Sequence, residues 1–332
     1  MTWRHIMFGV ATPDRPEPSA MGKAARLASA LDAELELFHC VFDPDVGRVP
    51  LIGWRAIEPD IRDTVEQRRR RLEAAAERLR AEGVVVRTTV RWDDPPYEGI
   101  VRQVLRHKPD LLVVQSTRRS RAARLVLTHT DYRLIEACPC PLLLIKTPRP
   151  YLDARVVAAV DPLHTHDKPA ALDDAILDAA SAVSQALGGE LHVFHACVPW
   201  PVVAGRSGQL RRLAEAVQPE VSARYRETTE ARVAEVARRQ LVPKRRVHIE
   251  AGRAVESLPR FAKSICADIV AMGAVSRSLP KRALIGPTAE RVLDALDCDV
   301  LIAKPPGFRS PVSRRSVHRL PKRGAQRARY VL

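Results

Sequence analysis

The feature that most constrains the fold of this chain is an internal repeat. Residues 110–148 align without a gap on residues 268–306, an offset of 268 − 110 = 158 positions. Apolar residues meet apolar residues along almost the whole alignment, and polar residues also coincide, as Thr130 does with Thr288. The period is much longer than the ~20–50 residues of a solenoid repeat, so the chain is predicted to contain two copies of one domain.

The repeat divides the chain into three segments. We expect a first domain over residues 1–148, a second domain over 149–306 and a basic, disordered tail over 307–332. A chain of 332 residues also suits two domains, because single domains usually contain roughly 100–200 residues. The two domains are expected to pack on each other as an internal pseudo-dimer.

Short apolar runs alternate with amphipathic stretches inside each copy. The predicted strands are 6–11, 34–39, 84–90, 110–115 and 141–146 in the first copy, and 155–160, 190–195, 245–250, 268–273 and 299–303 in the second. The second copy has predicted helices at 169–187, 219–241, 253–266 and 287–296. Runs without alternation are typical of strands buried on both faces. The fold class is therefore α/β, and each domain is expected to hold a five-stranded parallel sheet in the order 3-2-1-4-5, flanked by helices.

In such a sheet, a ligand would bind beyond the carboxyl ends of strands 1 and 4, where the strand order reverses. In the second copy these ends lead into Asp161-Pro162 and into the loop from Gly273 to Gly286. Glycine at position 273 would permit a sharp exit from the strand and the close approach of a ligand. The N–H groups and dipole of the helix that opens at Gly286 could receive a phosphate. The alternative is that these glycines only end the strand and begin the helix, and bind no ligand.

The two loops of the second copy carry the resemblance to a known family. The chain resembles the universal stress proteins, whose nucleotide motif is Gly-x2-Gly-x9-Gly-Ser/Thr. The matching positions are Gly273, Ser276, Gly286 and Pro287, with Thr288 one residue beyond the hydroxyl position. The resemblance also implies that Asp161 contacts the adenosine part of a nucleotide.

The first copy departs further from the motif. Gln115, Arg118, Thr128 and His129 stand at the motif positions, and Thr12 replaces the aspartate. We therefore expect only the second copy to keep a usable binding site.

Longer stretches narrow the resemblance to the E-type tandem members of the family. These stretches are RWDDPPYEGIVRQV, LTHTDYRLIEACPCPLLLIK and GPTAERVLDALDCDVLIAKPP. The resemblance implies flavodoxin-like domains of the HUP type, a cytoplasmic location and a role in stress resistance that includes survival of DNA-damaging agents.

Two hypotheses for the function follow. In the first, the second domain weakly binds ATP, ADP or another phosphorylated ligand through Asp161, Gly273, Ser276, Arg277, Gly286 and Thr288. In the second, the chain is an interaction or scaffold protein whose loops are relics and whose crevice is closed. The sequence shows neither a nucleophile–base arrangement nor a convincing metal-ligand spacing, so we expect a protein that is not an enzyme and holds no metal. The matching histidines His39 and His195 are expected to bond the backbone.

The positive charge of the chain suggests a further partner. The net charge is +15, which would suit nucleic acid. Eight basic residues lie in the tail, which has no acidic residue, so nonspecific contact of the tail with polyanions is expected. Homo-oligomers are compatible with the sequence. No apolar run approaches the ~20 residues of a membrane span, so we expect no membrane partner.

Overall fold

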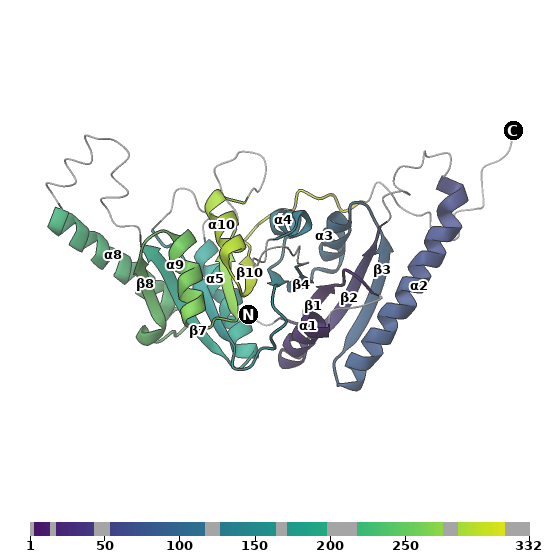
Figure 1. Ribbon diagram of the computed structural model, residues 1–332, viewed down its shortest axis with the longest axis horizontal. Helices are drawn as coiled ribbons and strands as arrows, with labels where there is room; N and C mark the ends of the chain where they lie inside the picture. The colour runs from purple at the N-terminus through teal and green to yellow at the C-terminus, as the bar shows by residue number, and fades with distance from the viewer. Residues whose placement is uncertain are drawn as a thin grey trace.

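The computed structural model describes residues 3–13, 18–42, 54–116, 127–163, 171–197, 218–274 and 285–315 (Figure 1). The elements of the first domain are β1 (His5–Gly9), α1 (Pro18–Ala30), β2 (Glu34–Val41), α2 (Trp54–Ala81), β3 (Val86–Trp92), α3 (Pro96–His107), β4 (Leu111–Gln115), α4 (His129–Ala137) and β5 (Leu142–Ile145). The elements of the second are β6 (Arg155–Ala159), α5 (Leu172–Ala186), β7 (Glu190–Cys197), α8 (Gln218–Arg238), η2 (Lys244–Arg246), β8 (Val247–Ala251), α9 (Ala254–Ser264), β9 (Ile269–Gly273), α10 (Pro287–Ala295) and β10 (Asp299–Ala303).

The predicted strand order is confirmed in both domains. The first domain has the order β3-β2-β1-β4-β5 and the second β8-β7-β6-β9-β10, and every pairing inside a domain is parallel. The two sheets are not separate, however. Strand β5 pairs with β10 in the antiparallel sense, which produces one sheet of ten strands. Periodicity along the sequence could not show this join, because it depends on how the two domains meet.

The join between the domains is symmetric. At its centre Leu143 lies opposite Leu301, and 301 − 143 = 158 is the offset of the repeat. Each of these leucines therefore faces its own counterpart, as residues do at the axis of a two-fold dimer. The expected pseudo-dimer is present, and its pseudo-axis passes between these two residues.

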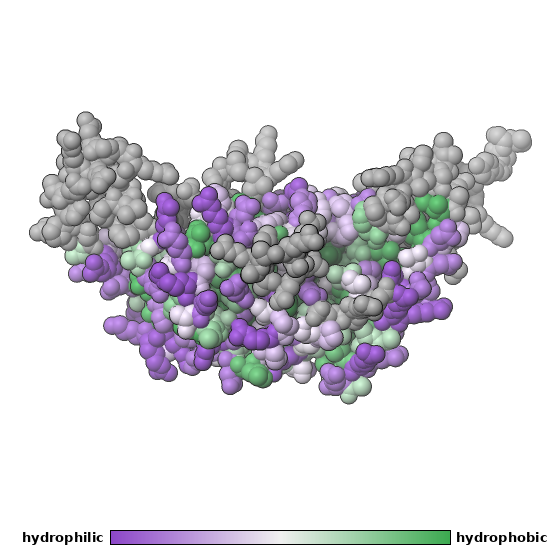
Figure 2. All heavy atoms as spheres, viewed as in Figure 1, coloured by the Kyte–Doolittle hydropathy of each residue, from purple (hydrophilic) through white to green (hydrophobic). Residues whose placement is uncertain are grey.

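Helices cover both faces of the sheet (Figure 1). One buried apolar cluster packs under α1, α2, α5 and α8, and the other under α3, α4, α9 and α10. Both clusters contain residues of both domains, since Leu143 and Leu301 lie in the first, and Leu144 and Val300 in the second. Hydrophilic residues cover most of the face shown in Figure 2, where hydrophobic residues form separate smaller areas. Because each buried cluster contains residues of both domains, the two domains share a continuous core.

Two buried lysines cross the join in opposite directions. Lys146 donates from Nζ to the carbonyl oxygen of Leu293 at 2.8 Å, near the end of α10. Lys304 donates to the carbonyl oxygen of Ile135, near the end of α4. Both pairs are related by the offset of 158, and a cation near the C-terminus of a helix interacts favourably with the helix dipole.

One buried polar cluster at the join has no symmetric counterpart. Asp299 is completely buried and accepts hydrogen bonds from Lys23 Nζ at 2.5 Å and from the Tyr151 hydroxyl at 2.7 Å. It also accepts one from the backbone N–H of Thr147 at 2.9 Å. The position equivalent to Asp299 in the first domain, Pro141, carries no carboxylate. Asp299 therefore ties α1 and the segment between the domains to β10.

The beginning of the basic tail returns to the first domain (Figure 1). Val312 packs against the cluster under α3 and α4, and Arg102 of α3 donates to the carbonyl oxygen of Ser313 at 3.2 Å. Residues 307–315 thus lie against the first domain, although we expect disorder for the tail. Residues 316–332 lie outside the described part of the chain, and their polyanion contact stays a prediction.

Candidate functional site

The second domain has a cavity where the strand order reverses. Its volume is about 600 Å³, and Asp161, Gly273, Gly286 and Thr288 all line it. Four of the six predicted site residues therefore come together at the carboxyl ends of β6 and β9. The other two, Ser276 and Arg277, lie outside the described residues.

Asp161 lies two residues after the end of β6, at one side of the cavity. Its backbone N–H donates to the carboxylate of Asp173, in the first turn of α5, at 3.0 Å. The side chain of Asp161 is 44% exposed, and its Oδ1 lies 3.8 Å from Nδ1 of His195. The carboxylate is thus held at the mouth of the cavity and is accessible to a ligand.

The structure gives Gly273 a role in packing. A Cβ atom at this position would lie 2.6 Å from Cδ2 of Leu172, which is too close. The absence of a side chain therefore lets the start of α5 pack against the end of β9. The sequence interpretation, a glycine that lets a ligand approach, missed this internal contact.

Helix α10 begins beside the cavity without a side-chain cap. Gly286 is its N-cap residue, no side chain of the described residues caps it, and Pro287 is the first helical residue. Thr288 and Ala289 follow in the cavity wall. Since the first N–H groups of a helix have no partner within the helix and the dipole favours negative charge, an anion would be stabilised at this terminus.

Two arginines add positive charge to the same cavity. Arg291, in α10, and Arg253, the N-cap residue of α9, both line it and are exposed. Arginine presents N–H donors in a geometry that matches phosphate oxygens. Sequence analysis did not single out these two residues, because each lies outside the family motif.

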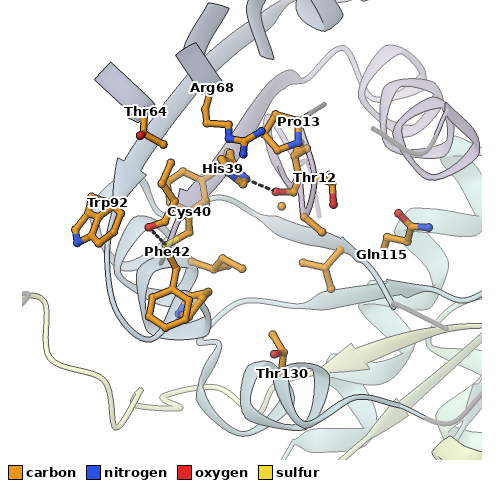
Figure 3. Close-up of a pocket in the computed structure, with 18 of the residues that line it drawn as sticks. Thr12, Pro13, His39, Cys40, Phe42, Thr64, Arg68, Trp92, Gln115 and Thr130 are labelled. Atoms are coloured by element: carbon orange, nitrogen blue, oxygen red, sulfur yellow. Dashed lines mark hydrogen bonds between the residues drawn. The ribbon is translucent and has the colours of Figure 1, made fainter. Parts of the chain in front are cut away.

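The first domain also has a cavity, contrary to the expectation that only the second copy keeps a usable site. It lies at the equivalent place, with a volume of about 610 Å³ (Figure 3). Gln115 and Thr130 line it and correspond to Gly273 and Thr288. Thr12 also lines it, but the place of Asp161 is taken by Ala11 and not by Thr12 as expected, because Val10 and Val160 make the same bonds to His39 and His195. The loss of the motif has therefore changed the lining of the cavity without filling it.

Helix α2 forms a wall of the first cavity. Ile57, Asp60, Ile61, Thr64 and Arg68 contribute from this helix. The described residues of α8, the corresponding helix, contribute nothing to the second cavity. The two cavities thus differ in their surroundings as well as in their loops.

The helix that begins at the first cavity, α4, is capped by its own residues. Thr128 is the N-cap residue, and its hydroxyl accepts from the backbone N–H of Asp131 at 3.2 Å. In return, the carboxylate of Asp131 accepts from the backbone N–H of Thr128 at 2.8 Å and from the Ser116 hydroxyl at 2.7 Å. Asp131 is only 3% exposed. The Thr-x-x-Asp spacing is a capping-box signal that the sequence analysis missed.

The matching histidines bond the backbone, as predicted. Nδ1 of His39 lies 2.8 Å from the carbonyl oxygen of Val10, and Nδ1 of His195 lies 3.0 Å from that of Val160. Burial lowers the pKa of His39, and the positive charge of Arg68 lowers it further, while its bond to Val10 opposes both effects. His39 thus connects β2 to the residue that follows β1, and His195 connects β7 to the residue that follows β6.

The described part of the chain shows neither a metal-ligand cluster nor a membrane-spanning helix. All six cysteines are free thiols, and the sulfur atoms of Cys138 and Cys140 lie 3.5 Å apart. In the described part of the chain, no group of three His, Cys, Asp or Glu side chains is arranged to hold a metal ion. None of the helices described there combines the length and apolarity of a membrane span.

Comparison with known proteins places the fold and the repeat in a family. The model for the universal stress protein family matches residues 2–146 and 154–304. Universal stress protein E of Escherichia coli (strain K12) is 26% identical over 321 residues, which cover 92% of this chain and 96% of that protein. Universal stress protein E of Photorhabdus laumondii is 23% identical over 311 residues, covering 91% and 96%.

Solved structures agree with this match. A protein from Pseudomonas aeruginosa UCBPP-PA14 has a TM-score of 0.69 at 29% identity, and the similarity covers 91% of this chain and 94% of that one. A universal stress protein from Archaeoglobus fulgidus has a TM-score of 0.62 at 16% identity, covering 92% and 99%, and supports the fold alone.

Proposed function

This chain belongs to the universal stress protein family, with one family domain in each half, and from this premise we propose that its second domain weakly binds a phosphorylated small molecule such as ATP or ADP. The names of its relatives support a role in the stress response. A cytoplasmic location and a binding role, as opposed to a catalytic one, are parts of the same proposal.

The observation that carries the proposal is the uncapped start of α10 inside a cavity of about 600 Å³. Small-molecule sites typically have volumes of ~300–1,000 Å³. A phosphate at Gly286 would accept hydrogen bonds from the first N–H groups of the helix and charge-assisted bonds from Arg291 or Arg253. The accessible carboxylate of Asp161 could then accept hydrogen bonds from the uncharged part of the ligand.

The interaction hypothesis predicts a closed crevice in the second domain. The cavity of the second domain is open, so it favours the binding hypothesis over this alternative.

The proposal is tested by calorimetric titration of the full chain with ATP and with ADP. Replacing Ala289 by Asp would bring a carboxylate to the place that Asp131 holds in the first domain, and should weaken binding tenfold or more. Replacing the same residue by Asn is the matched control, because it adds nearly the same volume without the charge and should weaken binding much less. Asp161→Ala should also weaken binding.

The result also separates the two hypotheses. A chain that binds neither nucleotide, and from which no phosphorylated molecule is released on denaturation, would favour the interaction role. Equal binding by the Ala289→Asp and Ala289→Asn variants would show that the phosphate does not lie at α10.

A further inference from the structure

The cavity of the first domain has its own chemistry, which differs from that of the second. The position that is open to an anion at α10 is taken at α4 by the buried carboxylate of Asp131. A phosphate placed there would meet this negative charge, and would compete with it for the N–H groups of the helix. The first cavity is therefore unsuited to an anionic group at its helix terminus.

Apolar and aromatic side chains form much of the wall. Phe38 is a buried part of the lining. Phe42 and Trp92 lie on the side of the cavity next to Cys40 (Figure 3). Phe42 is 37% exposed, so its ring is accessible from the cavity. Ile57 and Ile61 extend the apolar wall along α2. An apolar molecule that displaces water from such a surface lowers the free energy of the system, so its binding is favourable.

The polar groups of the cavity are mostly uncharged. Thr12, Gln115 and Thr130 lie away from Phe42 and Trp92 (Figure 3). Burial raises the pKa of the Cys40 thiol to about 12, so the thiol is neutral near pH 7. Two charged residues of α2 also line the cavity, Asp60 and Arg68, and their charges are opposite. Hydroxyl and amide groups would thus offer hydrogen bonds to a ligand that carries no charge.

We propose that the cavity of the first domain is a second binding site, specific for an uncharged molecule that contains an aromatic ring. The ring would lie against Phe42 and Trp92, and a hydrogen-bonding group would face Thr12 and Gln115. A cavity of about 610 Å³ is large enough for a molecule of two or three fused or linked rings. This proposal is independent of whether the second domain binds a nucleotide.

A pair of fluorescent probes tests the charge selection. N-phenyl-1-naphthylamine is uncharged, and 8-anilino-1-naphthalenesulfonate has the same rings with a sulfonate added. We expect the full chain to bind the uncharged probe, with a rise in its fluorescence, and to bind the anionic probe at least tenfold more weakly at the same site.

A pair of equivalent substitutions identifies the cavity. Thr130 and Thr288 are both exposed, lie in the first turns of α4 and α10, and each line one cavity. Thr130→Trp should fill the first cavity and weaken binding of the uncharged probe tenfold or more. Thr288→Trp should leave that binding component unchanged. Circular dichroism and thermal unfolding would establish that both variants are folded.

A third variant probes the aromatic contact without filling the cavity. Phe42→Ala should weaken binding of the uncharged probe about threefold to tenfold, the range expected when one aromatic pair is lost. The proposal is overturned if the uncharged probe does not bind, if Thr130→Trp leaves its binding intact, or if the anionic probe binds the same site as tightly.

Discussion

Helices α4 and α10 occupy equivalent places in the two domains, but their first turns satisfy the backbone in different ways. In α4, Thr128 and Asp131 bond each other's backbone, and Ser116 adds a third hydrogen bond. In α10 the same positions are Gly286, Ala289 and Ala274, which have no side-chain oxygen. The comparison shows that a few side chains decide whether a helix terminus contributes to the stability of the fold or stays available to a ligand.

The largest loss of stability is expected where the two halves differ most within the join. Asp299→Ala would leave the Lys23 ammonium, whose side chain is 2% exposed, without its carboxylate. Losing one partner of a buried ion pair typically costs about 3–5 kcal/mol, and we expect a loss of that size in denaturant unfolding. Tyr151→Phe, which removes one hydrogen bond to the same carboxylate, is the control. A loss no larger than that of the control would contradict this role of Asp299.

A comparable loss, shared equally by the two domains, is expected at the pseudo-axis. Leu143→Ala and Leu301→Ala each remove a completely buried side chain, so each should lower the free energy of unfolding by about 2–5 kcal/mol. Because each leucine faces its counterpart, the two losses should be similar. Denaturant unfolding of both variants measures them, and clearly unequal losses would show that the surroundings of the axis are not symmetric.

The caps of α4 and α10 should respond to substitution in opposite directions. Asp131→Ala removes the acceptor for Ser116 and for the backbone of Thr128, and should destabilise the chain by about 2 kcal/mol, since hydrogen bonds to charged groups contribute roughly 1.5–3 kcal/mol. Ala289→Asp, without nucleotide, should stabilise the chain by about 0.3–1 kcal/mol through the helix dipole. Thermal and denaturant unfolding would check both. A destabilising Ala289→Asp substitution would contradict the comparison.

Much of the fold could be predicted from the sequence. Buried strands and amphipathic helices leave local patterns, and the repeat let each half support the assignment of the other. The meeting of the loops that begin at Asp161 and Gly273 followed from the strand order, while Gly286 and Thr288 were identified from the family motif. Local patterns do not record which strand edges meet, so the pairing of β5 with β10 was not predicted.

The features of the site that were not predicted also have physical reasons. Gly273 was interpreted for its freedom of backbone and ligand approach, but its contact is with Leu172, about 100 residues earlier in the chain. The cavity of the first domain was not predicted, because the nucleotide motif does not include the apolar side chains of α2 and β3 that line it. Only the capping box of α4 had a sequence signal that could have been used, Thr128-x-x-Asp131.

The smallest effect is expected on the pKa of His39, when a charged residue of α2 in the wall of the first cavity is replaced. Burial is the main cause of the lowered pKa of His39, and Arg68 on α2 adds to it. Arg68→Ala should therefore raise the pKa of His39 toward its ordinary value. An NMR titration of the ring resonances measures the change, with Arg69→Ala, an exposed neighbour, as the control. An unchanged or lower pKa would show that α2 does not influence the cavity electrostatically.

The antiparallel contact between β5 and β10 bears on how these differences could arise. In a homodimer built the same way, a single codon change alters both subunits, so neither site can change alone. Here each half has its own stretch of the gene, while the pairing of their last strands keeps the assembly together. The binding site of one domain can therefore be lost in favour of a more stable helix terminus, or can change to bind a new ligand, while selection preserves the site of the other domain.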